Sequence, residues 1–255
     1  MKTLYEFATE KMQESIQHYF EIVEKTNNFL DFDIELFEDP HARQMVLAGK
    51  SLEYKDLTPE QCLDAVSRVG AVKFDIEKGV SAYVYENSRE YISLLISKAS
   101  EVSGEFSNIT PETVKDNAYL LPIWQAALNI ASKANLKTIF GSASDQNISG
   151  PSSIKISDYA NDYFSKNTIN IIQIKDRTER TLEGIIRDLV GRLLYEAVVK
   201  DALESEGVPF KAEEEYSGIA GVVYKFRSDF VIPDEENPLA FIEVRKSSSR
   251  HASLY

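Results

Sequence analysis

Apolar residues recur at three- and four-residue steps along most of the chain, a pattern typical of helices that bury one face. The pattern predicts a helix over residues 4–30, a short helix at 40–48, and longer helices over 71–100 and 117–135. We therefore expect region 1–145 to be a mainly helical domain.

Two of the expected helix starts carry agreeing local signals. Thr58-Pro59-Glu60-Gln61 combines a capping threonine, a proline at the first helical position and a glutamine three residues after the cap. Thr110-Pro111-Glu112-Thr113 repeats the threonine and the proline. Each of these tetrapeptides predicts that a helix begins there.

The composition changes near Gly141. The stretch GSASDQNISGPSSIKISD that begins there is rich in glycine, serine, asparagine and proline, which favour turns and loops. We interpret residues 146–165 as a connector and place the domain boundary there. Residues 166–255 then form a second domain.

The second domain is expected to begin with a short strand at Ile169–Ile174. A long helix follows, which starts near Thr178 and which Gly207 is well placed to terminate. Gly184 and Gly191 are seven residues apart on roughly one side of this helix, which would allow a sheet or another helix to approach closely.

After the long helix the hydrophobic period becomes that of strands. Residues 208–232 and 239–244 are rich in β-forming side chains, and the prolines and polar residues of 233–238 predict a loop between them. If these strands pair, Asp229 and Glu243 meet on one face. A divalent cation would offset the repulsion between their carboxylates.

Strand alternation bears on which cation joins this acidic pair. Regular geometry directs Glu243 and Arg245 to one side and Lys246 to the other. A bulge after Val244 would reverse that choice and bring Lys246 to the site. Arginine stays charged and cannot act as a base, although it can clamp a phosphate.

Metal-binding side chains other than carboxylates are few. Cys62 is the single cysteine among 255 residues, which excludes a disulfide framework and a cysteine-rich zinc site. His18 and His41 are isolated, without a partner four residues away, so structural or surface roles are expected for them.

The formal charge of −13, from 41 acidic and 28 basic residues, argues against non-specific adhesion to nucleic acid or to an anionic membrane. This charge does not exclude DNA as a partner, because a local basic face or a metal can outweigh the mean charge.

The N-terminus lacks the apolar core of a signal peptide, and no apolar run reaches the roughly 18 residues of a membrane span. We expect a soluble, cytoplasmic protein that has no membrane partner.

A predicted helix that carries Glu196 is followed by Asp229 and then by the run Glu243-Val244-Arg245-Lys246. This order resembles the PD-(D/E)xK nuclease superfamily, and type II restriction endonucleases in particular. The resemblance implies a restriction-endonuclease-like core of the α+β or α/β class. It also implies that Asp229 and Glu243 are ligands of Mg2+ and that Glu196 is an accessory acid. Arg245 stands where the family usually has lysine, so either Arg245 or Lys246 would be the catalytic cation.

The family core continues with another helix and a fourth strand, which we expect this chain to lack after Glu243. The resemblance implies a Mg2+-dependent endonuclease that hydrolyses phosphodiester bonds of double-stranded DNA. A homodimer would suit a palindromic target, the helical region would serve recognition or dimerisation, and a cognate methyltransferase would belong to the same system without direct contact. The alternative is a catalytically inactive nuclease-like or helical protein-interaction module.

Overall fold

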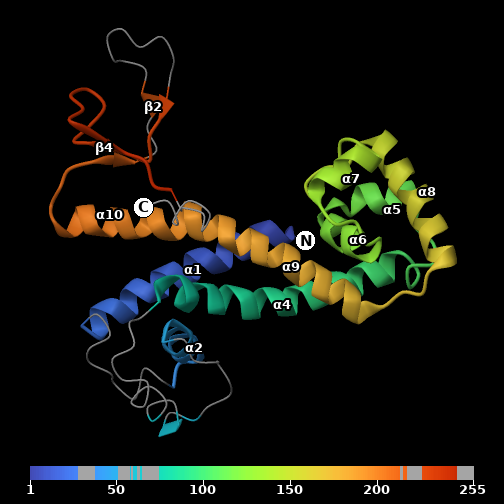
Figure 1. Ribbon diagram of the computed structural model, residues 1–255, viewed down its shortest axis with the longest axis horizontal. Helices are drawn as coiled ribbons and strands as arrows, with labels where there is room; N and C mark the ends of the chain where they lie inside the picture. Colours follow the sequence, from blue (N-terminus) through green and yellow to red (C-terminus); the bar gives the residue numbers. More distant parts are fainter. Residues whose placement is uncertain are drawn as a thin grey trace, which may run out of the picture. The chain divides into compact units, whose positions relative to one another are not determined.

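The computed structural model describes residues 1–27, 38–50, 58, 60, 61, 64, 75–212, 215, 216 and 226–245. These residues belong to two compact units, Met1–Ile186 and Arg187–Tyr255. Helices make up the first unit, and the second combines a helix with short strands (Figure 1). The mixed α+β class expected from the sequence is therefore confirmed.

Three helices form one part of the N-terminal unit: α1 (Leu4–Lys25), α2 (Pro40–Gly49) and α4 (Ile76–Val102). Both α1 and α2 pack against α4. The stripe of apolar residues predicted on each helix is the face that is buried, and its fully buried members include Leu4, Met12, Met45, Leu47, Ile92 and Leu95. The three helices predicted in this region are confirmed, with ends that differ by a few residues.

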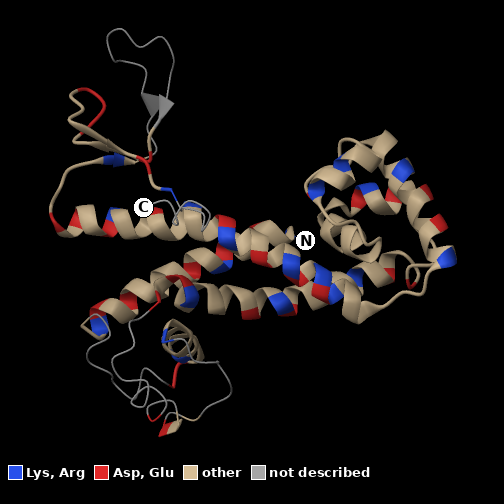
Figure 2. Ribbon diagram, viewed as in Figure 1, with Lys and Arg blue, Asp and Glu red and all other residues tan. Residues whose placement is uncertain are grey.

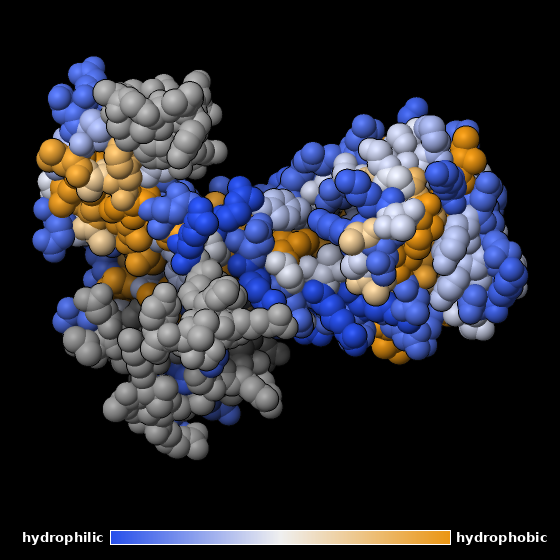
Figure 3. Space-filling view, turned by 45° about the horizontal axis from the view of Figure 1, so that its top comes forward, coloured by the Kyte–Doolittle hydropathy of each residue, from blue (hydrophilic) through white to orange (hydrophobic). Residues whose placement is uncertain are grey.

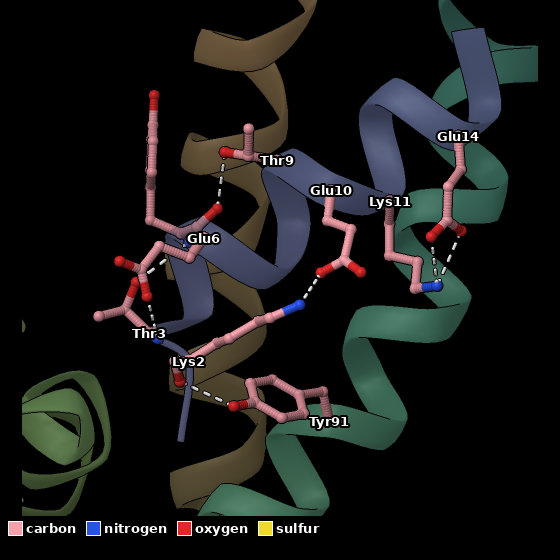
Figure 4. A network of polar contacts seen from close by, with 9 residues as sticks. Lys2, Thr3, Glu6, Thr9, Glu10, Lys11, Glu14 and Tyr91 are labelled. Atoms are coloured by element: carbon pink, nitrogen blue, oxygen red, sulfur yellow. Dashed lines mark hydrogen bonds and ion pairs between the residues drawn. The ribbon is translucent and has the colours of Figure 1, made fainter. Parts of the chain in front are cut away.

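The start of α1 is held by a reciprocal cap. The Thr3 hydroxyl accepts the Glu6 N–H at 3.1 Å, and the Glu6 carboxylate accepts the Thr3 N–H at 2.8 Å (Figure 4). The Tyr91 hydroxyl of α4 donates to the Lys2 carbonyl at 2.7 Å, and the Tyr91 ring stacks on Phe7 with ring centroids 4.1 Å apart. These contacts secure the first turn of α1 on α4.

Both predicted capping tetrapeptides make their bonds. The Gln61 N–H donates to the Thr58 hydroxyl at 3.3 Å, and the Gln61 side chain accepts the Thr58 N–H at 2.9 Å. At the second site the Thr113 N–H donates to the Thr110 hydroxyl at 3.1 Å and α5 (Pro111–Asp116) follows. Pro59 lies outside the described residues.

The single helix expected over 117–135 is instead a series of shorter elements. These are the 3-10 turn η2 (Ala118–Leu120), α6 (Leu121–Ala127) and the first residues of α7 (Lys133–Phe140). Asn129 adopts a left-handed conformation with φ 56° and ends α6. The apolar spacing did not show this break because buried side chains continue across it, among them Trp124, Leu128 and Ile130.

The expected connector at 146–165 is mostly a helix, α8 (Gly150–Lys166). Its polar residues suggested a loop, but they cap this helix and bind it to a neighbouring segment. Ser149 caps the helix by accepting the Ser152 N–H at 3.3 Å, and the buried Ser157 donates to the Ile109 carbonyl at 2.7 Å. The two compact units divide later, between Ile186 and Arg187.

The prediction of a strand at Ile169–Ile174 is also wrong, because α9 (Ile171–Leu189) begins there. Its β-branched isoleucines favoured a strand, but the Asn170 side chain accepts the Gln173 N–H at 3.1 Å and starts a helix. The expected close approach at Gly184 is absent as well, since a Cβ there would meet no described atom within 4 Å.

After α9 come the π-helical turn η3 (Val190–Leu194) and α10 (Tyr195–Ser205). Gly207, at φ 64°, donates to the Glu204 carbonyl, and Val208 donates to the Leu203 carbonyl. These bonds satisfy the last carbonyls of α10, so the prediction that Gly207 terminates this helix is confirmed.

The strands of the C-terminal unit are β1 (Lys211–Ala212), β2 (Glu215–Tyr216), β3 (Phe226–Arg227), β4 (Phe230–Ile232) and β5 (Ala240–Ile242). One antiparallel sheet has the order β1-β4-β5, and β2 pairs with β3. The middle part of the expected 208–232 strand region, residues 217–225, lies outside the described residues.

Hydrophilic residues interrupt the apolar surface on the face drawn in Figure 3, where apolar residues form separate patches. Among the described helices, none combines the length and the apolar character that crossing a membrane requires.

Candidate metal site at the β4–β5 hairpin

The candidate site lies at the open end of the hairpin formed by β4 and β5. Its register pairs Phe230 with Ile242, Val231 with Phe241 and Ile232 with Ala240. One further step of the same register sets Asp229, just before β4, opposite Glu243, just after β5. Opposed residues of an antiparallel pair share a face, so the hairpin brings these two carboxylates to one edge of the sheet.

Side-chain bonds extend the hairpin beyond its last backbone pair. The Asp229 Oδ2 accepts the Val244 N–H at 2.6 Å. The buried Ser228 hydroxyl lies 2.9 Å from the carbonyl oxygens of both Phe230 and Ile242. Asp229 therefore has a defined orientation, because its carboxylate takes the place of a backbone acceptor at the end of β5.

Glu243 is bound by the arginine two residues later. Its Oε1 accepts from Arg245 Nε at 3.0 Å and from Arg245 Nη2 at 2.8 Å. The Arg245 side chain is 80% exposed and that of Glu243 is 46% exposed. Exposed pairs of this kind contribute only about 0–1 kcal/mol, so a cation or a phosphate can compete with either partner.

Two further residues belong to the predicted site, Lys246 and Glu196. Lys246 lies outside the described residues, so the choice between Arg245 and Lys246 stays open. Glu196 lies in the first turn of α10. Within the described ranges, no three Asp, Glu, His or Cys side chains form a group that could hold a metal ion.

The donor set can nevertheless be tested against Mg2+. This ion prefers oxygen ligands and is often held by one or two carboxylates, with waters and substrate phosphates completing its shell. Asp229 and Glu243 each use one oxygen in the bonds given above, and no bond to a described residue occupies the other. The donor chemistry of the two carboxylates therefore suits Mg2+.

The chain matches no family model, no curated protein and no solved structure. The resemblance to the nuclease superfamily therefore depends on the residues of the hairpin and on Glu196 in α10.

Sequence reasoning missed a second cluster of titratable side chains, in the N-terminal unit. His18 of α1 and His41 of α2 stack with ring centroids 3.9 Å apart, and His41 also stacks on Tyr83 of α4 at 3.7 Å. His18 Nε2 lies 3.2 Å from Asp39 Oδ2. The two histidines are isolated in sequence but are in contact in the fold.

Further charged groups border this stack. The Tyr83 hydroxyl lies 3.2 Å from Glu14 Oε2, and Lys11 Nζ lies 2.8 Å from the same oxygen. His41 Nε2 is buried and makes no hydrogen bond with a described residue. Burial, with His18 as a second cause and Asp39 opposing it, lowers the pKa of His41 from 6.5 to about 4.

This environment predicts a pH-dependent stability that His41→Phe removes. The folded state keeps His41 neutral, whereas the unfolded chain protonates it below about pH 6.5. Protonation of His41 in the unfolded chain should therefore lower the unfolding free energy of the wild type by about 1–2 kcal/mol between pH 6.5 and pH 4. This value is smaller than the full pKa shift implies, because His41 is partly exposed and solvent screens it. Urea unfolding at several pH values, followed by the fluorescence of the single tryptophan, Trp124, measures the difference.

Tyr83→Phe is the matched control, because it keeps a ring against His41 and leaves the imidazole in place. It should retain the wild-type pH dependence over this range. A wild-type pH dependence in His41→Phe would contradict the prediction.

Proposed function

We propose that this protein is a Mg2+-dependent endonuclease of restriction type that hydrolyses phosphodiester bonds of double-stranded DNA. The observation that carries the proposal is the β4–β5 hairpin, whose register sets Asp229 opposite Glu243 beside the guanidinium of Arg245. Two carboxylates can hold a divalent metal ion, and a nearby cation can stabilise charge on a phosphate, so this edge of the sheet offers groups that metal-assisted phosphodiester hydrolysis can use.

In this proposal Asp229 and Glu243 hold Mg2+. When bound, Mg2+ supplies Lewis-acid stabilisation of the phosphate and lowers the pKa of water. The bond from Val244 N–H orients the Asp229 carboxylate before the ion arrives. Water attacks phosphorus in line, the bond to the leaving oxygen breaks, and a proton ends on that oxygen.

The two remaining residues take the roles that the resemblance implies. Arg245 donates only two of its five N–H bonds to Glu243, so its guanidinium has donors left for a phosphate oxygen. It stabilises charge and does not act as a base. Glu196 serves as the accessory acid from α10, and Lys246 is the alternative cation.

The helical unit serves DNA recognition or dimerisation. A homodimer with two-fold symmetry would match a palindromic target, because the symmetry of the site then mirrors that of the protein.

Cleavage of supercoiled plasmid DNA tests the proposal. Nicked or linear product should form with Mg2+ and be absent with EDTA. No product from the folded, full-length chain with Mg2+ or Mn2+, on plasmids of varied sequence, would contradict it.

The Glu243–Arg245 ion pair favours a second candidate, a nuclease-like module without activity. An arginine that holds the proposed metal-binding carboxylate competes with the ion, and arginine cannot act as a proton carrier in place of the lysine that is usual in the nuclease superfamily. Titration calorimetry with Mg2+ separates the two candidates. The nuclease predicts a heat of binding, whereas the inactive module predicts none.

A further inference from the structure

The N-terminal unit contains a cavity of about 200 Å³ that is unrelated to the hairpin. Residues from the start of α1, from α6, α7 and α9, and from the segment after α7 line it. Its apolar lining is contributed by Tyr5, Leu121, Pro122, Leu136, Ala143 and Ile185. An apolar cavity of about 150 Å³ admits benzene, so this space suits one ring or a short alkyl chain.

A second hollow, of about 410 Å³, lies next to the first. Gln125, Lys133 and Thr181 line both, so the two spaces adjoin. The second hollow is more polar, since Arg177 and Arg180 of α9 also line it. The two together offer an apolar space beside a cationic one.

The cations of this region are only partly neutralised. Lys and Arg occur on α7, on α8 and along α9 (Figure 2). Lys133 and Arg177 form no ion pair with a carboxylate of the described residues, and Arg180 pairs with Asp176 at 2.8 Å. Asp145 is the acidic residue that lines the first hollow.

Arg177 is also held in place by uncharged acceptors. Its Nη1 donates to the Ala126 carbonyl at 3.0 Å and its Nη2 to Gln173 Oε1 at 3.3 Å. The guanidinium is therefore anchored at the end of α6 while its charge stays available to an anion. The capped start of α7, where Ser132 accepts the Asn135 N–H at 3.1 Å, adds the partial positive charge of a helix N-terminus.

We propose that the adjoining hollows bind a phosphomonoester that carries a single ring or a short alkyl group. The apolar group enters the smaller hollow between Leu121, Leu136 and Ile185. The phosphate dianion lies in the larger hollow against Lys133, Arg177 and Arg180, because a planar guanidinium can donate two parallel hydrogen bonds to phosphate oxygens. This site is independent of the proposed nuclease activity.

Titration calorimetry of the full chain with phenyl phosphate tests the site, with inorganic phosphate and phenol as comparisons. We expect phenyl phosphate to bind at least tenfold more tightly than either comparison compound. Absence of binding at millimolar phenyl phosphate would overturn the proposal. Equal affinity for inorganic phosphate would also overturn it, because the apolar hollow would then contribute nothing.

Two variants locate the binding. Gly184 lines the larger hollow, and a Cβ there meets no described atom within 4 Å, so Gly184→Leu should fill the space and keep the helix. It should weaken binding at least tenfold, and Lys133→Gln should weaken it about three- to tenfold. Lys155→Gln, on the exposed side of α8, is the matched control and should bind like the wild type. Wild-type affinity in Gly184→Leu, with an unchanged circular dichroism spectrum, would overturn the proposal.

Discussion

Replacing Asp229 with asparagine should lower Mg2+-dependent DNA cleavage at least about 100-fold. Asparagine keeps an oxygen that can accept the Val244 N–H, so the hairpin should persist while the charge that holds the ion is lost. A metal ion contributes several kcal/mol of charge stabilisation to phosphoryl chemistry, and each 1.36 kcal/mol changes a rate about tenfold. Plasmid cleavage rates at several Mg2+ concentrations measure the loss.

Asp234→Asn provides a matched control in the same hairpin. The Asp234 Oδ1 accepts the N–H groups of Glu236 and Asn237 at 3.0 and 2.9 Å, and an asparagine oxygen can accept both. This variant should cleave like the wild type. A wild-type rate in Asp229→Asn would contradict the assigned role. Equal losses in both variants would indicate damage to the hairpin instead.

The largest effect on stability is expected from Leu95→Ala in α4. Leu95 is fully buried on the helix against which α1 and α2 both pack. Removal of a buried leucine side chain costs about 2–5 kcal/mol, through lost burial and the cavity left behind. Urea unfolding followed by Trp124 fluorescence should show a lower midpoint with a similar slope.

Leu94→Ala is the control on the same turn of α4. Leu94 is 53% exposed, so its truncation should change the unfolding free energy by no more than about 0.5 kcal/mol. Similar losses in the two variants would show that the buried face of α4 is not what stabilises this unit.

Arg245 is the residue that separates the two candidate functions. Its ion pair with Glu243 is largely exposed, so water screens it and Mg2+ can displace the guanidinium at small cost. In the endonuclease the guanidinium would then turn to the phosphate. In the inactive module it would stay on Glu243 and block the ion.

Local signals in the sequence predicted helix ends well. The caps at Thr58 and Thr110 and the stop at Gly207 depend on bonds between residues three to five positions apart, so the sequence encodes them directly. The same local reasoning failed for α8 and for the start of α9. Serine and isoleucine have loop and strand preferences there, but the capping bonds of Ser149 and Asn170 outweighed them.

The β4–β5 hairpin could be predicted from the sequence, because β-forming residues stand on each side of a short stretch rich in proline and other turn formers, so the pairing is local. The stacking of His18, His41 and Tyr83 could not be predicted from the sequence, and neither could the adjoining cationic and apolar hollows beside Lys133. These groups come from helices far apart in the chain. Residue spacing encodes which face of a helix is buried, but packing alone decides which helix that face contacts.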